Sequence, residues 1–61
     1  MTTELTNKQL DVLAELRRRN CDFLAGCTEE HWRKGESYYI DTRVNVPTSL
    51  RRKFEAANPN V

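Results

Sequence analysis

Three side chains that could bind a metal lie close together in the middle of the sequence. Cys21, Cys27 and His31 have the spacing C-x5-C-x3-H. A structural zinc site needs four protein ligands. The sequence has no other Cys or His, so a carboxylate such as Asp22 or Glu30, or a partner chain, would have to complete the site. We therefore predict no bound metal and no cofactor, and we interpret the cysteines as reduced thiols.

A cysteine and a histidine could also act as nucleophile and base. That chemistry needs donors that stabilise an oxyanion, and enough surrounding structure to exclude water. The sequence has no Gly-rich turn that could supply the donors, and 61 residues enclose little. We expect that the protein is not an enzyme and that His31 is solvated.

Basic side chains form two groups. Residues 17–19 are three consecutive arginines, and consecutive helical residues point about 100° apart, so we interpret this group as a solvated helix end. The second group flanks Pro47 and could contact phosphates from a corner between an extended segment and a helix. A solvated helix face explains it equally well. These possible nucleic-acid contacts are Arg43, Arg51, Arg52 and Lys53.

Aromatic residues could stack on bases, but in a small domain they more often fill a core or an interface. Residues 38–46 alternate apolar and polar side chains with the period of a strand. We assign this apolar face and the nearby tryptophan to a possible protein interface. Its members are Trp32, Tyr38, Tyr39, Ile40, Val44 and Val46.

Local signals predict where the first helix begins. Thr6 and Gln9 have the spacing of a capping box. An apolar stripe of helical period follows, and it predicts one helix that runs to Gly26 unless Asn20 ends it early. The stripe consists of Leu10, Leu13, Leu16, Phe23 and Leu24.

Two further helices are predicted. Thr28 can cap the second, because two glutamates follow it and suit the positive end of a helix dipole. Gly35 ends this helix, or the helix continues through the glycine. After Pro47, Thr48 or Ser49 can cap a last helix with one apolar side. That side consists of Leu50, Phe54 and Ala57.

The segment 38–46 lies between these helices, and a lone strand cannot satisfy its own backbone groups. It must pair with another molecule or with further sequence, or serve as an extended connector. We predict that its main contacts lie outside a compact core of this chain. The fold class is then mainly α, with two to three short helices and one extended or β segment, about 38–46. Residues 1–61 form a single small domain or the N-terminal segment of a longer chain.

Size and charge restrict the partners. A chain of 61 residues buries a marginal core, so self-association or another protein chain is expected. The net charge of +1 argues against a general polyanion binder, although residues 31–61 carry six Lys/Arg against three Asp/Glu. Nucleic acid remains a possible partner. No membrane is expected, since "FLAGC" is far shorter than the ~20 residues of a membrane span.

The order of these features resembles the opening region of portal proteins of tailed bacteriophages. The chain reads "LAELRRRN", then "WRKGESYY", "NVPTSLRRKF" and "NPNV". The residues that carry the resemblance are Leu13, Leu16, Arg17, Arg19, Trp32, Gly35, Tyr38, Tyr39, Pro47, Leu50, Arg51, Asn58 and Pro59. The resemblance implies a structural component of an oligomeric ring through which DNA is packaged, located in the virion or the host cytoplasm. Portal proteins have several hundred residues, so this chain would correspond to an N-terminal piece of one.

Two other functions fit the same residues. The first is a small nucleic-acid-binding regulator that uses the basic C-terminal helix. The second is a small phage or bacterial protein whose aromatic extended segment binds a host protein by pairing with the edge of a sheet. A coding sequence that continues past Val61 would favour the portal reading over both.

Overall fold

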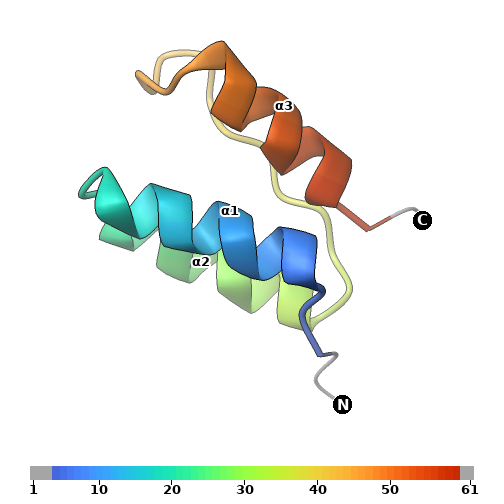
Figure 1. Ribbon diagram of the computed structural model, residues 1–61. Helices are drawn as coiled ribbons and strands as arrows, with labels where there is room; N and C mark the ends of the chain where they lie inside the picture. The colour runs from blue at the N-terminus through green and yellow to red at the C-terminus, as the bar shows by residue number, and fades with distance from the viewer. Residues whose placement is uncertain (1–3, 60–61) are drawn as a thin grey trace.

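The computed structural model describes residues 4–59, and over that range the chain forms three helices and no strand (Figure 1). They are α1 (Asn7–Arg18), α2 (Asp22–Arg33) and α3 (Thr48–Ala57). α1 and α2 lie side by side as an antiparallel hairpin, and α3 packs against α1. The mainly α class predicted from the sequence is confirmed.

The start of α1 is the one that the sequence predicts. The Thr6 backbone N–H donates to Gln9 Oε1 at 2.9 Å, and the Gln9 backbone N–H donates to Thr6 Oγ1 at 3.2 Å. Both halves of the capping box are therefore present.

The end of α1 comes earlier than Gly26. Asn20 adopts φ 60°, which is the left-handed conformation that asparagine tolerates better than most residues. Its N–H donates to the Arg17 carbonyl at 3.1 Å, and the Cys21 N–H donates to the Leu16 carbonyl at 2.9 Å. These two bonds are a Schellman motif. The early break at Asn20, one of the two alternatives, is thus confirmed, and the long helix to Gly26 is wrong.

α2 begins six residues before the predicted cap at Thr28. Cys21 occupies the N-cap position without a side-chain hydrogen bond, and Asp22 lies in the first turn. Thr28 is fully buried inside the helix, where its hydroxyl donates to the Leu24 carbonyl at 2.8 Å. The predicted cap is wrong because a threonine hydroxyl can also be satisfied by the carbonyl one turn back.

The stop at Gly35 is confirmed, and the continuation of the helix through the glycine is wrong. Gly35 has φ 78°, which glycine adopts without strain. Its N–H donates to the Trp32 carbonyl at 3.0 Å, and the Glu36 N–H donates to the His31 carbonyl at 2.9 Å. α2 therefore ends in a second Schellman motif.

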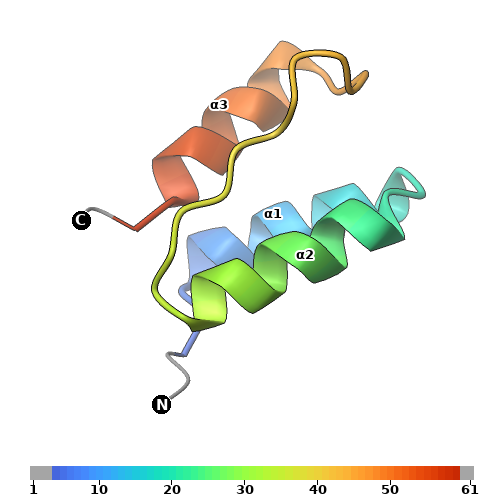
Figure 2. The ribbon, with the colours of Figure 1, turned by 180° about the vertical axis from the view of Figure 1, so that it is seen from behind.

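Residues 36–47, here called the strap, run between α2 and α3 (Figure 2). The strand alternative for 38–46 is wrong, and the segment is an extended connector with a local turn in which the Val44 N–H donates to the Asp41 carbonyl at 2.9 Å. The prediction that its main contacts lie outside the core is also wrong. Ile40 is buried, and its partly buried neighbours in the strap pack against the core. These neighbours are Tyr38, Val44 and Val46.

α3 buries the predicted face but is capped differently. Pro47 occupies the N-cap position and no side chain caps the helix, so the predicted caps at Thr48 and Ser49 are wrong. The helix ends at Ala57, with Asn58 as the C-cap. Asn60 and Val61, the last two residues of "NPNV", lie outside the described residues.

One core holds the three helices and the strap together. It consists of Val12, Leu13, Leu16, Ala25, Trp32, Ile40, Leu50, Phe54 and Ala57. Three members of the predicted apolar stripe are not among these nine residues: Leu10 is 49% exposed, Phe23 is 85% exposed, and Leu24 is partly buried and packs against the core. The break at Asn20 turns the chain back, so a stripe counted through it no longer describes one face.

Candidate interaction surface

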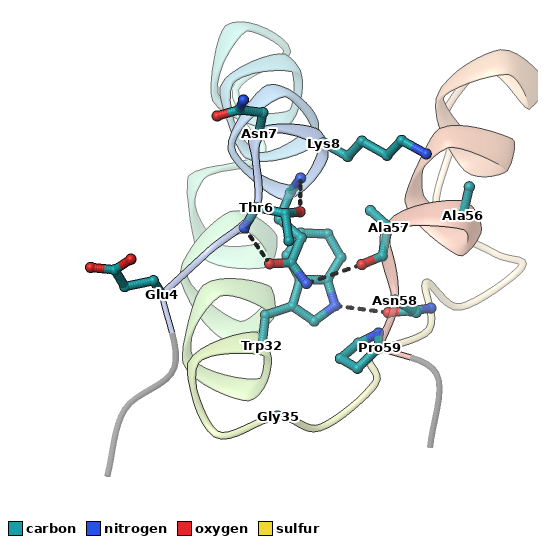
Figure 3. Close-up of a pocket in the computed structure, with 11 residues that line it drawn as sticks. Glu4, Thr6, Asn7, Lys8, Trp32, Gly35, Ala56, Ala57, Asn58 and Pro59 are labelled. Atoms are coloured by element: carbon teal, nitrogen blue, oxygen red, sulfur yellow. Dashed lines mark hydrogen bonds between the residues drawn. The ribbon is translucent and has the colours of Figure 1, made fainter.

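The end of the molecule where α1 starts and α3 stops is closed by side-chain hydrogen bonds (Figure 3). Trp32 Nε1–H donates to Asn58 Oδ1 at 2.8 Å, and Gln9 Nε2–H donates to the Ala57 carbonyl at 3.0 Å. Trp32 is only 1% exposed and packs against Phe54 with ring centroids 5.1 Å apart. The structure therefore places this predicted interface residue inside the core.

The Asn58 side chain also holds the first part of the strap. Its Oδ1 accepts a second hydrogen bond from the Tyr38 backbone N–H at 3.1 Å. Because both neighbours are donors, the amide cannot be turned over without placing donors against donors. This leaves Asn58 Nδ2 buried with no partner among residues 4–59.

An open pocket of about 520 Å³ lies beside this closed end, between the start of α1 and the end of α3. Its lining includes Trp32 and the alanines at the end of α3. The only titratable side chains in the lining are Glu4 and Lys8. The hydroxyl of Thr6, which also lines the pocket, accepts a hydrogen bond from the Gln9 backbone N–H in the capping box.

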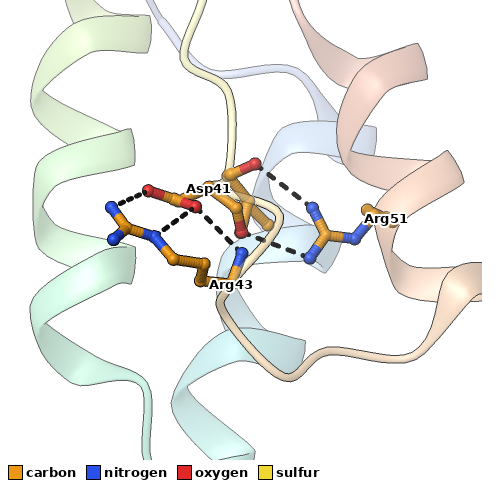
Figure 4. A network of polar contacts seen from close by, with 4 residues as sticks. Asp41, Arg43 and Arg51 are labelled. Atoms are coloured by element: carbon orange, nitrogen blue, oxygen red, sulfur yellow. Dashed lines mark hydrogen bonds and ion pairs between the residues drawn. The ribbon is translucent and has the colours of Figure 1, made fainter.

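Two of the four possible nucleic-acid contacts are engaged within the chain (Figure 4). Arg51 reaches the strap and donates to the carbonyls of Ile40 at 3.2 Å, Asp41 at 3.3 Å and Val44 at 2.8 Å. Arg43 lies on the Asp41 carboxylate, with Nη2 to Oδ2 at 3.0 Å. The Arg43 side-chain hydrogen bond is the largest cause that lowers the pKa of Asp41, and its backbone hydrogen bond acts in the same direction.

The other two candidates lie exposed on α3. Lys53 Nζ is 4.0 Å from Asp11 Oδ2, and Arg52 makes no ion pair with residues 4–59. The four basic residues thus do not converge on one surface. Most arginines outside this group are also paired, as in Arg18 with Glu15 at 2.7 Å and Arg17 with Glu29 at 3.5 Å.

The cysteines and the histidine do not form a metal site. Cys21 and Cys27 are free, half-buried thiols. Within residues 4–59 no three His, Cys, Asp or Glu side chains are grouped so that they could hold a metal ion. His31 stacks against Tyr38 with centroids 5.1 Å apart, and its Nδ1 lies 3.6 Å from Glu36 Oε1.

Large apolar side chains reach solvent at three positions in the described part of the chain. Tyr39, a predicted interface residue, is 71% exposed, whereas its neighbour Ile40 is 9% exposed. Leu10 is half exposed, and Phe23 is the most exposed of the three. Phe23 was missed because it was assigned to the stripe of the first helix. Counting α2 alone would have found it, since the buried residues Ala25, Thr28 and Trp32 define the opposite side of that helix.

Phe23 belongs to a surface that we call the outer face of α2. It consists of Phe23, Gly26, Cys27 and Glu30. The last three follow Phe23 by three, four and seven residues, so all four share one side of the helix. A Cβ built at Gly26 would meet no atom within 4 Å. The outer face therefore carries an uncovered phenyl ring beside a backbone position with open space around it.

Comparison of the chain with known protein families, with curated protein sequences and with solved structures finds no match. In the range 4–59 none of the helices has the length and apolar character that crossing a bilayer requires.

Proposed function

We propose that this chain is a non-enzymatic structural segment that docks on another protein chain within a larger assembly. The observation that carries the proposal is Phe23, which is 85% exposed although α2 already buries a separate stripe in the core. Burying a phenylalanine side chain is worth about 1.5–3 kcal/mol. A docking partner would recover that free energy.

Within this proposal, the assembly is a portal of a tailed bacteriophage, as the resemblance implies. Several residues that carry the resemblance have structural roles: Leu13, Leu16 and Leu50 lie in the core, and Gly35 ends α2. This supports the proposal, since a portal segment with these residues would use them to form the same small unit. The native coding sequence tests it. A frame that continues past Val61 for several hundred residues agrees with the proposal, and a stop codon there removes the portal.

A nucleic-acid regulator is the second candidate, and the exposed Arg52 and Lys53 favour it. Against it, Arg51 and Arg43 already bind groups of the chain itself. Titration of duplex DNA over a salt series separates the two functions. A Kd that rises steeply with salt, with a slope reduced by about one in Arg52→Ala, would support DNA binding.

Hydroxyl-radical footprinting tests docking directly, because it measures how accessible each aromatic side chain is. Phe23 should be oxidised readily in the dilute isolated chain and should be protected in the native assembly. Trp32, which is buried in either case, is the internal reference. Equal oxidation of Phe23 in both samples would contradict the proposal.

A further inference from the structure

We infer that the outer face of α2 packs against the outer face of α2 from a second copy of this chain, with the two helices antiparallel. This inference rests on the proposed function, because it names the docking surface and its occupant.

The apolar part of the contact is Phe23 and its surroundings. Cys27 is half-buried and lies one turn further along the same side, and Gly26 leaves open space beside it. A ring that projects from a helix next to a residue without a side chain allows another helix to approach closely. A second helix can therefore approach closely at Gly26 while it covers the ring of Phe23.

The fit between two copies follows from the spacing. If the two-fold axis passes close to Cys27, Phe23 of one copy faces Cys27, Glu30 and Lys34 of the other, residues three or four apart that form a hole between neighbouring turns. In each chain Glu30 and Lys34 pair at 3.3 Å. Their aliphatic stems would cover the ring of Phe23, and the ammonium group would lie near its face.

Charge selects the antiparallel direction. Asp22 begins α2 and Arg33 ends it, and eleven residues are close to three full turns, so both lie on the same side of the helix. Asp22 has no ion pair with residues 4–59, and Arg33 has only a 3.9 Å approach to Glu29. An antiparallel pair places each Asp22 opposite Arg33 of the second copy. A parallel pair would place like charges together.

The arginines at the end of α1 do not oppose this arrangement. Arg17 is paired with Glu29 and Arg18 with Glu15. Arg19 lines a pocket together with Leu50 and Lys53, on the side of α3. Two of the three arginines that precede α2 are therefore already in ion pairs within the chain, and the third lies on the side of α3.

The contact between the two copies is small, so the dimer should be weak. A helix of 12 residues is about 18 Å long. A contact along one helix of this length buries an area at the low end for specific interfaces. We therefore expect a weak dimer. A two-fold contact closes on itself and joins copies in pairs, so a ring would need a second surface.

Sedimentation equilibrium over a concentration series measures the association. We expect a reversible dimer, with Phe23→Ser weakening it about tenfold or more. Tyr39→Ser is the matched control, since it removes another exposed aromatic ring from the strap, and it should leave the Kd unchanged. Asp22→Arg should weaken the dimer, and adding Arg33→Asp should restore it.

Mild oxidation supplies a second readout, because Cys27 would lie near the two-fold axis. The dimer should form a disulfide in Cys21→Ser but not in Cys27→Ser. A wild type that stays monomeric at all concentrations, or a dimer that Phe23→Ser does not weaken, overturns the inference. If the chain is monomeric while Phe23 is protected in the native assembly, a different protein is the occupant and the proposed function stands. If Phe23 is not protected there, the proposed function fails as well.

Discussion

The strap buries an apolar residue that its sequence pattern would expose, and the outer face of α2 exposes one that its pattern would bury. In the strap Ile40 is 9% exposed, although its alternating pattern suggests a strand that seeks another molecule. In α2 Phe23 is 85% exposed, although its pattern suggests a core position. Periodicity therefore describes the neighbours of a residue within one unbroken element. It does not say which side of that element the rest of the chain will cover.

The contrast is sharpest between the two phenylalanines, since Phe54 is 1% exposed. We predict that Phe54→Ala lowers the free energy of unfolding by about 3–5 kcal/mol, because it leaves a cavity beside Trp32. Phe23→Ala should change it by no more than about 0.5 kcal/mol in the dilute monomer. Chemical denaturation at low concentration measures both. Similar losses for the two variants would contradict the contrast.

Neighbouring residues in the strap allow a second test. Ile40→Ala should cost about 2 kcal/mol, at the low end for such a substitution because the strap can settle into the space. Tyr39→Ala, one residue away and 71% exposed, should cost little. The melting temperatures of the two variants give the comparison. An unaffected Ile40→Ala would return the strap to the role of an external binding segment.

Elements with complete local signals could be predicted from the sequence. The capping box at Thr6, the stop at Gly35 and the buried face of α3 depend on residues within a few positions of each other. The core position of Leu13 follows from the stripe of α1 for the same reason.

The end of α1, the path of the strap and the outer face of α2 depend on contacts between distant parts of the chain. Asn20 could end a helix or continue it, and only the packing of α2 against α1 decides between them. Among residues 4–59 the strap has no strand partner, and three of its carbonyls accept hydrogen bonds from Arg51, up to eleven residues further on. The outer face of α2 was missed because the break at Asn20 was left open. The side of the helix on which Phe23 lies depends on where α2 begins.

Arg51 explains why the strap stays on the core, so its replacement tests the cause of the contrast. Arg51→Lys keeps the charge but loses the planar group that donates to three carbonyls. We predict a loss of about 1–2 kcal/mol in the free energy of unfolding. Arg52→Lys, on the exposed side of α3, is the matched control and should be neutral. Faster hydrogen exchange in the strap of Arg51→Lys would show where the loss occurs.

The smallest effect concerns the turn at the tip of the strap. The pKa of Asp41 lies below its ordinary value, chiefly because Arg43 donates to the carboxylate. A lowered pKa means that the unfolded chain binds the proton more readily, so the stabilisation is present above the ordinary pKa and is lost as the pH falls through the folded pKa. Because the carboxylate is exposed and screened by solvent, the effect should be small.

We therefore expect wild type to be slightly more stable than Asp41→Asn at neutral pH, and the difference to disappear as the pH falls from the ordinary pKa of an aspartate through the lowered pKa of the folded chain. Denaturation curves across that range measure the difference. In an Arg43→Gln background the pH dependence should be smaller, because the largest cause of the shift is gone while the backbone hydrogen bond from residue 43 remains. A difference that persists unchanged in acid would mean that Asp41 stabilises the turn without its charge. The strap would then be held at its tip by backbone geometry, and within residues 4–59 Arg51 would be the one charged side chain that anchors it there.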